Sequence, residues 1–264
     1  MTVELSFAAV LAIRMVVTAL FVLGATMIAE RAGPLVGGLI ATLPLGGGPV
    51  YVFLAMDHDA AFIADSAITT LAINVANVVF AVTYARLAQR NGLWTSLPGA
   101  LAVWLALAIA VNALPWTWQR AALFNIAVLP VCLWLARPVR LTAVPRIAAR
   151  WHELLMRAAM VAALVGVTVT LSFRIGPGAS GILAVFPMIL ISVILILHSR
   201  VGGPPSAAVM ANAVLGLFGF GFAAAALHFA APAFGSAVAL SIALAISIGW
   251  SLLVIAARRR GIPV

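Results

Sequence analysis

The sequence predicts an all-α integral membrane protein with about nine transmembrane helices, built as two inverted four-helix repeats joined by one further helix (4+1+4). Three observations support this fold class. Of the 264 residues, 65% are hydrophobic and only 8% are charged, whereas soluble domains carry about 25% charged residues. The apolar residues form runs of about 20, the length that crosses a bilayer. A pattern of arginine, glycine and proline also recurs, from Arg14 in the first copy to Arg157 in the second.

The repeated pattern lies where helices should break. Seven residues of the first copy recur at the same spacing in the second: Arg14, Arg31, Gly33, Pro34, Gly38, Ala41 and Pro44 match Arg157, Arg174, Gly176, Pro177, Gly181, Ala184 and Pro187. Hydrophobic residues match by chance in any membrane protein, but arginine, glycine and proline in fixed register do so much less easily. Internal repeats are a common way of building a transporter.

Polar breaks between the apolar runs set the order of the elements. They predict spans near 6–29, 34–56, 61–85, 93–113, 119–136, 154–173, 177–198, 206–230 and 234–256. Repeat one then occupies 1–113, span five and a cytoplasmic amphipathic segment occupy 114–153, and repeat two occupies 154–264. Five spans separate equivalent points, so the second copy crosses the membrane in the opposite sense.

The arginines predict the orientation. Nine spans place most of them on one face, namely Arg31, Arg86, Arg90, Arg137, Arg140, Arg146, Arg150, Arg157, Arg200 and Arg258 to Arg260, and only Arg120 and Arg174 on the other. Basic residues collect on the cytoplasmic side. We therefore expect a multi-pass protein of the bacterial cell inner membrane, with the N-terminus outside and the C-terminus in the cytoplasm.

Spans two and seven contain the candidate substrate site. Proline removes a backbone donor and glycine weakens a helix, so neither span should run undisturbed. A pair of Gly/Pro-interrupted spans at matching positions is the best sequence indication of a midplane site. Alternatively, the prolines only kink the helices and the glycines allow close packing. The candidate residues in these two spans are Thr42, Pro44, Gly46, Gly47, Gly48, Gly181 and Pro187.

A few polar residues in other spans complete the candidate site. Asn74 and Asn77 share one face of span three, and Asn212 lies on span eight. These amides either line the site or hydrogen-bond between helices, for about 0.6 kcal/mol each. Asp65, at the outer start of span three, is a candidate coupling group for protons or an N-cap-like residue. Arg14, without a local partner in span one, is a candidate counter-charge, although an arginine near a span end can also reach the head groups.

No enzyme signature is present. The sequence lacks HExxH, GxSxG and P-loop motifs, and its four histidines lack metal-ligand spacing. We expect no catalytic residue, no metal and no cofactor. The positive charge is that of an oriented membrane protein near an anionic leaflet, so no nucleic-acid partner is expected. The lipid bilayer is the partner that the composition implies. The sequence is also compatible with a homodimer.

The segment Gly33 to Asn112 resembles the small GlpM-type bacterial membrane proteins and their half-length relatives. The resemblance rests on PLVGGLIATLPL (Pro34 to Leu45), followed by a short acidic break and an asparagine-bearing helix. It implies that this chain is a fused double-length version, with one unit in about 1–113 and a diverged copy in 154–256. It also implies an envelope-related role, because that family is associated with exopolysaccharide production.

Two functions follow from these observations. The first is a secondary transporter or flippase of a small organic or anionic solute, working by alternating access about the broken spans two and seven. The second is a non-transporting accessory or scaffold protein for envelope polysaccharide synthesis or export. The first predicts a water-accessible cavity and the second a dry, well-packed interior.

Overall fold

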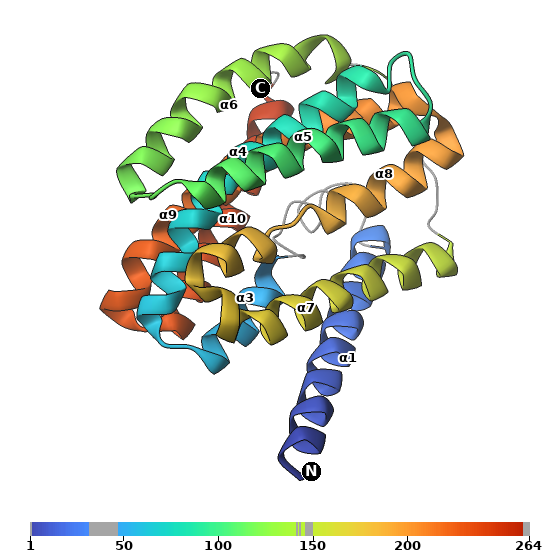
Figure 1. Cartoon of the computed structure of the whole chain (residues 1–264). Coiled ribbons are helices and arrows are strands. Elements are labelled where there is room, and N and C mark those ends of the chain that lie inside the picture. Colours follow the sequence, from blue (N-terminus) through green and yellow to red (C-terminus); the bar gives the residue numbers. More distant parts are fainter. Residues whose placement is uncertain (1, 32–46, 141, 143, 146–149, 261–264) are drawn as a thin grey trace.

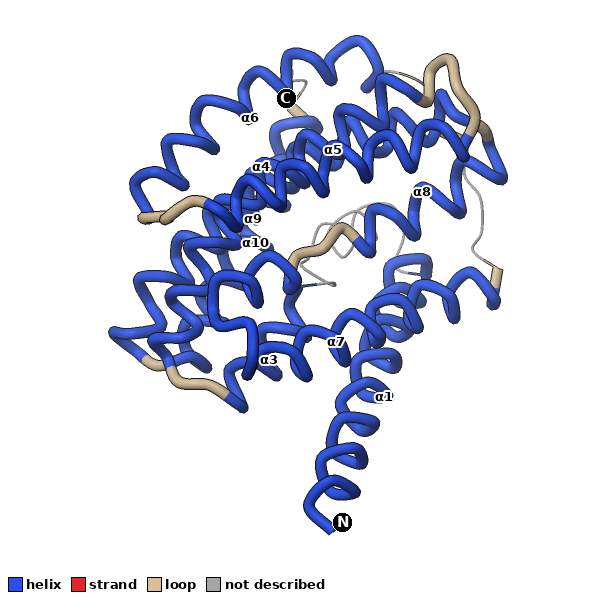
Figure 2. Tube along the Cα trace, viewed as in Figure 1, coloured by secondary structure: helices blue, strands red, loops and turns tan. Residues whose placement is uncertain are grey.

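The computed structural model describes residues 2–31, 47–140, 142, 144–145 and 150–260, and helices dominate this part of the chain (Figures 1 and 2). No strand occurs among these residues, which confirms the predicted all-α class. The helices are α1 (Thr2–Arg31), α3 (Gly47–Asp57), α4 (Ala60–Leu87), α5 (Leu93–Ala113), α6 (Trp118–Arg140), α7 (Trp151–Ala184), α8 (Met188–Val201), α9 (Gly203–Phe234) and α10 (Ser236–Arg259).

The helices are those of a multi-pass membrane protein. In the described part of the chain, 7 segments are long and apolar enough to cross a bilayer: Phe7–Met27, Ala60–Leu87, Leu93–Ala113, Trp118–Arg140, Trp151–Val201, Gly203–Phe234 and Ser236–Ala257. The segment Trp151–Val201 has 51 residues, far more than the roughly 20 of one crossing. By contrast, α3 has only 11 residues and cannot span by itself.

Two interruptions divide the long Trp151–Val201 segment. Within α7, Gly176 adopts φ +72° and ψ 179°, a left-handed φ that favours glycine. Pro177 follows and has no backbone N–H to continue the helix. A second interruption covers residues 185–187 between α7 and α8, where Pro187 precedes the first helical residue with ψ 43°. Both interruptions fall on glycine and proline residues of the repeated sequence pattern.

Helix α4 forms the centre of the molecule. It packs most extensively on α9 and also packs on α5, α6 and α7. Its fully buried side chains include Ile63, Ile73, Phe80 and Tyr84. A glycine allows α9 to approach the end of this helix closely: a Cβ at Gly203 of α9 would lie 2.1 Å from the carbonyl oxygen of Ala88, the C-cap of α4. Small residues at helix contacts serve this purpose in membrane proteins.

Helix α1 lies at the edge of the bundle and extends away from the other helices (Figure 1). Its main packing partner is α7. Large apolar side chains along it are exposed, including Ile13 and Leu20, each 62% exposed. Side chains of this kind suit contact with lipid, so the outer surface of α1 fits the membrane environment predicted from the composition.

Candidate functional site

The start of α3 lies directly against the interruption between α7 and α8. A Cβ at Gly47, the first residue of α3, would lie 3.3 Å from both the carbonyl oxygen of Ala184 and Cγ1 of Val185. The structure therefore brings the end of the predicted break in span two to the break in span seven. The candidates Thr42, Pro44 and Gly46 lie outside the described residues.

The interruption frees backbone carbonyl groups, and two side chains of α4 bind them. The amide N–H of Val185 donates to the Leu183 carbonyl oxygen, whereas in a continuing α-helix it would donate to the Gly181 carbonyl oxygen. Thr70 Oγ1 donates to the Gly181 carbonyl oxygen at 2.8 Å, and Asn77 Nδ2 donates to the Val185 carbonyl oxygen at 3.0 Å. Thr70 and Asn77 lie two turns apart on one face of α4. They provide the partners that broken backbone needs at membrane depth.

Both the oxygen and the nitrogen of the Asn77 side-chain amide form hydrogen bonds within the protein. Its Oδ1 accepts from Trp104 Nε1 at 2.7 Å, and its Nδ2 donates to the Val185 carbonyl oxygen. The side chain is only 4% exposed. These contacts join α4, α5 and the α7–α8 interruption. They favour the structural alternative for Asn77, because its amide oxygen and one amide hydrogen already have partners.

Asn74 lies one turn away and joins α4 to α6 and α9. Its Nδ2 donates to Asn125 Oδ1 at 3.1 Å and to the Leu217 carbonyl oxygen at 3.0 Å. Asn125 in turn donates to the carbonyl oxygens of Leu71 (2.7 Å) and Ala121 (2.8 Å). Asn74 is 0% exposed, and its Oδ1 has no hydrogen-bond partner among the described residues. Asn125, outside the predicted site, is therefore part of the same polar centre.

The remaining candidates of repeat two separate into two places. Gly181 and Pro187 lie at the α7–α8 interruption, and a Cβ at Gly181 would lie only 2.2 Å from the Ser66 carbonyl oxygen. Gly181 therefore permits the close approach of α7 to α4, as the packing alternative expects. Asn212 Nδ2 donates to the Arg140 carbonyl oxygen at 3.2 Å. This contact ties α9 to the end of α6, and Asn212 is not among the residues at the interruption.

A cavity of about 650 Å³ adjoins the start of α3. It is lined by parts of α1, α3, α4, α9 and α10, and its lining is almost entirely apolar. Two predicted site residues, Gly47 and Gly48, line it, together with Tyr51 and Thr70. The cavity thus extends from the interrupted backbone to the exposed surfaces of α1 and α10.

A smaller, more polar cavity of about 260 Å³ contains Asp65. Its other lining residues include Thr69, Asn112, Trp116 and Gly178. Asp65 is exposed and lies inside α4. The N-cap of α4 is Asp59, whose carboxylate accepts from the Phe62 amide at 2.9 Å. Asp65 therefore faces a polar cavity beside the second half of α7 and does not cap its helix.

Arg14 of α1 forms an ion pair with Asp57 at the end of α3. Two hydrogen bonds join the groups, one of them from Arg14 Nη2 to Asp57 Oδ1 at 2.7 Å. The side chains are only 13% and 14% exposed. The guanidinium also lies 5.5 Å from the centre of the Phe53 ring. The sequence around Arg14 contains no local partner, because Asp57 is 43 residues away in the chain.

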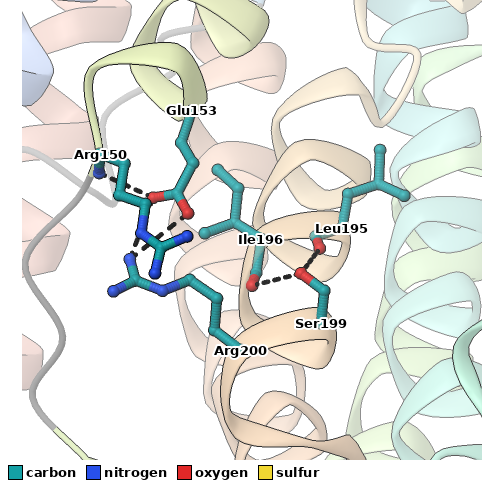
Figure 3. Close-up of polar contacts among 6 residues, drawn as sticks. All are labelled: Arg150, Glu153, Leu195, Ile196, Ser199 and Arg200. Carbon is teal, nitrogen blue, oxygen red and sulfur yellow. Dashed lines mark hydrogen bonds and ion pairs between the residues drawn. The ribbon is translucent and has the colours of Figure 1, made fainter.

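A second ion pair joins α8 to the start of α7 (Figure 3). Arg200 Nη1 lies 3.1 Å from Glu153 Oε2. The same carboxylate oxygen accepts from the backbone N–H of Arg150 at 2.8 Å, which fixes Glu153 in the first turn of α7. Glu153 is 6% exposed. The last turns of α3 and α8 are therefore each bound by an ion pair to the long helix that precedes them.

His58, between α3 and α4, connects this loop to α7. The Ser172 hydroxyl donates to the Val169 carbonyl oxygen, so His58 Nε2 donates to Ser172 Oγ at 2.8 Å. The imidazole stacks on Phe62 with the ring centres 3.8 Å apart. Burial lowers the pKa of His58, and the nearby Asp57 and Asp59 carboxylates only partly oppose this. The neutral imidazole is thus the form that this loop stabilises.

Comparison of the chain with protein-family models, curated proteins and solved structures finds no match in any of the three. The resemblance to the GlpM-type proteins accordingly stays an expectation from the residues that carry it.

Proposed function

We propose that this protein is a secondary transporter or flippase that works by alternating access about its two interrupted spans. The observation that carries the proposal is the contact between the start of α3 at Gly47 and the α7–α8 interruption at Ala184 and Val185. Inverted-repeat transporters place their substrate sites where such discontinuous helices meet near the midplane. The larger cavity lies directly beside this contact.

The limits of the helices support an inverted 4+1+4 repeat. Helix α4 begins at Ala60 and α9 at Gly203, while α5 begins at Leu93 and α10 at Ser236. Both intervals equal 143 residues, the spacing of the repeated sequence pattern. Asn74 also donates to Leu217, which is 143 residues further along the chain. Nine spans follow if α1, 34–56, α4, α5, α6, the parts of 151–201 on either side of Gly176, α9 and α10 each cross the membrane.

The two halves differ in how their short helices pack, as alternating access requires. In repeat two, α8 packs on α7, α9 and α5. In repeat one, α3 packs chiefly on α7, and the larger cavity occupies the space between α3, α9 and α10. Two repeats of one design in different conformations support a mechanism in which exchanging those conformations opens the opposite side.

The ion pairs occupy equivalent ends of the two halves. Asp57 and Arg200 are 143 residues apart, and each lies in the last turn of a short helix that it binds to a longer one. With the C-terminus in the cytoplasm, as the arginines indicate, Arg14–Asp57 lies at the outer end and Glu153–Arg200 at the inner end. Arg14 can serve as a counter-charge for an anionic group only when its pair with Asp57 opens. Asp65, in the smaller outer cavity, is the proposed coupling group.

The second candidate is a non-transporting accessory protein for envelope polysaccharide synthesis or export, and one observation favours it. The polar side chains beside the interruption mostly bind each other or the freed backbone, as Thr70 and Asn77 do. A dry, internally satisfied interior is what such a protein would have. Either protein would lie in the bacterial inner membrane, and water access to the interruption separates the two functions.

Impermeant thiol labelling tests the proposal. In a Cys132→Ser background, single cysteines replace Gly48 at the start of α3 and, separately, Val185 at the α7–α8 interruption. Oriented vesicles are treated from each side in turn, with cysteines at Thr117 and Asn91 as sidedness controls in the outer and inner loops. Alternating access predicts labelling of the interruption from both sides, with a ratio that changes with pH or with added solutes.

The absence of thiol labelling at the interruption would contradict the proposal. If neither Gly48→Cys nor Val185→Cys reacts from either side while both loop cysteines do, the interior is dry. The transporter proposal is then wrong, and identification of a co-purifying partner becomes the test of the accessory function.

A further inference from the structure

We propose that the cavity of about 650 Å³ binds the hydrocarbon chain of a membrane lipid, so that the cargo is an amphipathic lipid. This inference rests on the proposed function, because it takes the cavity beside the start of α3, which contacts the α7–α8 interruption, as the place where the cargo binds. It narrows the cargo from a small organic or anionic solute to a molecule with an apolar chain. The volume lies within the range of about 300–1,000 Å³ of ordinary ligand sites.

Among the described lining residues, the side chains offer a polar solute no free hydrogen-bond donor. Among the described lining residues no side chain is charged. Each of the five hydroxyl groups already donates within the protein: Thr18 to the Arg14 carbonyl (2.8 Å), Tyr51 to Thr70 (2.7 Å), Thr70 to the Gly181 carbonyl (2.8 Å), Ser241 to the Ala237 carbonyl (3.0 Å) and Ser247 to the Ala243 carbonyl (3.0 Å). A polar solute would find few side-chain partners to replace its water contacts, whereas a hydrocarbon chain needs none.

The cavity lies beside surfaces that suit lipid. Its lining includes exposed apolar side chains on three helices, among them Val17 and Phe21 of α1, Val52 of α3 and Leu244 of α10. Because α1 and α10 belong to the candidate membrane-spanning segments, their exposed side chains would meet acyl chains in a bilayer. A lipid chain can therefore enter sideways from the bilayer without crossing water.

One side of the lining leads to a charged group that suits a head group. Phe53 lines the cavity, and its ring lies 5.5 Å from the Arg14 guanidinium that pairs with Asp57. A lipid with its chain in the cavity can place its polar end beside this ion pair. The chain and the charge together match an amphipathic molecule better than a small solute.

Photo-crosslinking in vesicles tests the inference. The protein is reconstituted in phosphatidylglycerol vesicles that contain a small fraction of phosphatidylcholine with a diazirine at the end of one acyl chain. Irradiation is followed by peptide mapping. We expect several-fold more adduct at the partly buried lining residues Phe220 and Leu240 than at Ile109, which is 71% exposed on α5. Adding the same lipid without the diazirine should reduce the cavity adducts in a saturable way.

Two variants provide a matched comparison. Ser241→Phe places a large side chain in the lining, and Ala102→Phe makes a comparable change at an exposed position of α5. The first should lower the adducts at Phe220 and Leu240 several-fold, and the second should leave them unchanged. If Ser241→Phe does not fold, the saturable competition in the native chain still decides. Adducts that follow exposure alone, highest at Ile109 and not saturable, would overturn the inference.

A lipid translocation assay on the same vesicles separates this inference from the proposed function. Saturable cavity adducts with transfer of head-group-labelled lipid between leaflets would support both. Saturable adducts without transfer, and without thiol access at the interruption, would support lipid binding and refute transport. Thiol access that alternates without any cavity adduct would support transport and refute the lipid chain as its cargo.

Discussion

At the scale of single residues, Asn77 stabilises an interruption that would otherwise leave backbone groups unpaired in a membrane. Its amide holds the Val185 carbonyl oxygen on one side and accepts from Trp104 on the other. A side chain in such a position supports broken backbone whether or not it also contacts a substrate. Stability measurements can therefore measure this role separately from transport.

Replacing Asn77 by leucine should destabilise the protein by about 1 kcal/mol, because two interhelical hydrogen bonds are worth roughly 0.6 kcal/mol each in membranes. Unfolding in detergent, followed by circular dichroism, would measure this. Asn112→Leu is the matched control, because Asn112 is exposed on α5 and should change stability little. An equal loss in both variants would show that the interruption does not depend on Asn77.

His58 predicts a pH dependence of stability. Its pKa in the folded protein is lowered by burial, so the unfolded chain binds a proton more readily than the folded protein does. Stability should therefore be full above about pH 6.5, the ordinary histidine pKa, and should fall as the pH drops below it. Melting temperatures between pH 5 and pH 8 would show the slope. His58→Gln should flatten it, and His152→Gln at an exposed position should not.

The sequence predicts contacts between residues that are close together along the chain, but not those between residues on separate helices. Asn74 and Asn77 were identified because their spacing of three places them on one helical face. Trp104, Asn125 and Asp57 contact the predicted residues only through the packing of separate helices, and no local pattern indicates such contacts. The partner of Arg14 was missed for this reason.

At the scale of elements, glycines determine how closely the helices pack. A Cβ at Gly181 would lie 2.2 Å from the Ser66 carbonyl oxygen. Gly181→Ala should therefore destabilise the protein by about 1–3 kcal/mol, as overpacking does. Gly249→Ala in α10 is the control, because a Cβ there meets nothing within 4 Å. It should be neutral or slightly stabilising, since alanine favours a helix. Equal thermal shifts would contradict this packing.

The ion pair between α1 and α3 should tolerate exchange of its charges. Asp57→Asn leaves Arg14 unneutralised in a membrane-spanning helix, and we expect a loss of about 1–3 kcal/mol, between the values of exposed and buried pairs. Adding Arg14→Asp to Asp57→Arg should recover much of the stability of the native pair. Asp59→Asn removes the same charge two residues away and keeps an N-cap. A loss as large in this control would exclude a specific pair.

Helix limits were the best predicted feature at this scale. The span predicted at 93–113 coincides with α5, and the span predicted at 61–85 lies within α4 (Ala60–Leu87). Continuous apolar runs between polar loops define these helices. The packing of α3 was not predictable, because a helix of 11 residues takes its position from contacts with α7 rather than from its own hydrophobicity.

At the scale of the whole molecule, the orientation is a prediction from arginine placement. A reporter that is active only in the cytoplasm should function when fused after the C-terminus and fail when fused at Thr117. A fusion at Asn91 should behave like the C-terminal one, because both positions lie on the arginine-rich face. Activity at Thr117 but not at Asn91 would reverse the proposed orientation and exchange the outer and inner ion pairs.

The close approaches to α4 have a consequence for motion. Gly181 of α7 lies against α4 at Ser66, and Gly203 of α9 lies against Ala88, the C-cap of α4. With no side chain between the backbones, α4 cannot slide past either neighbour without separating from it, so these parts should move as one rigid body. Amide hydrogens of α4 should then exchange with deuterium most slowly in the molecule. Those of α1, which extends from the bundle edge (Figure 1), should exchange early, which would mark α1 as a part that moves independently of this body.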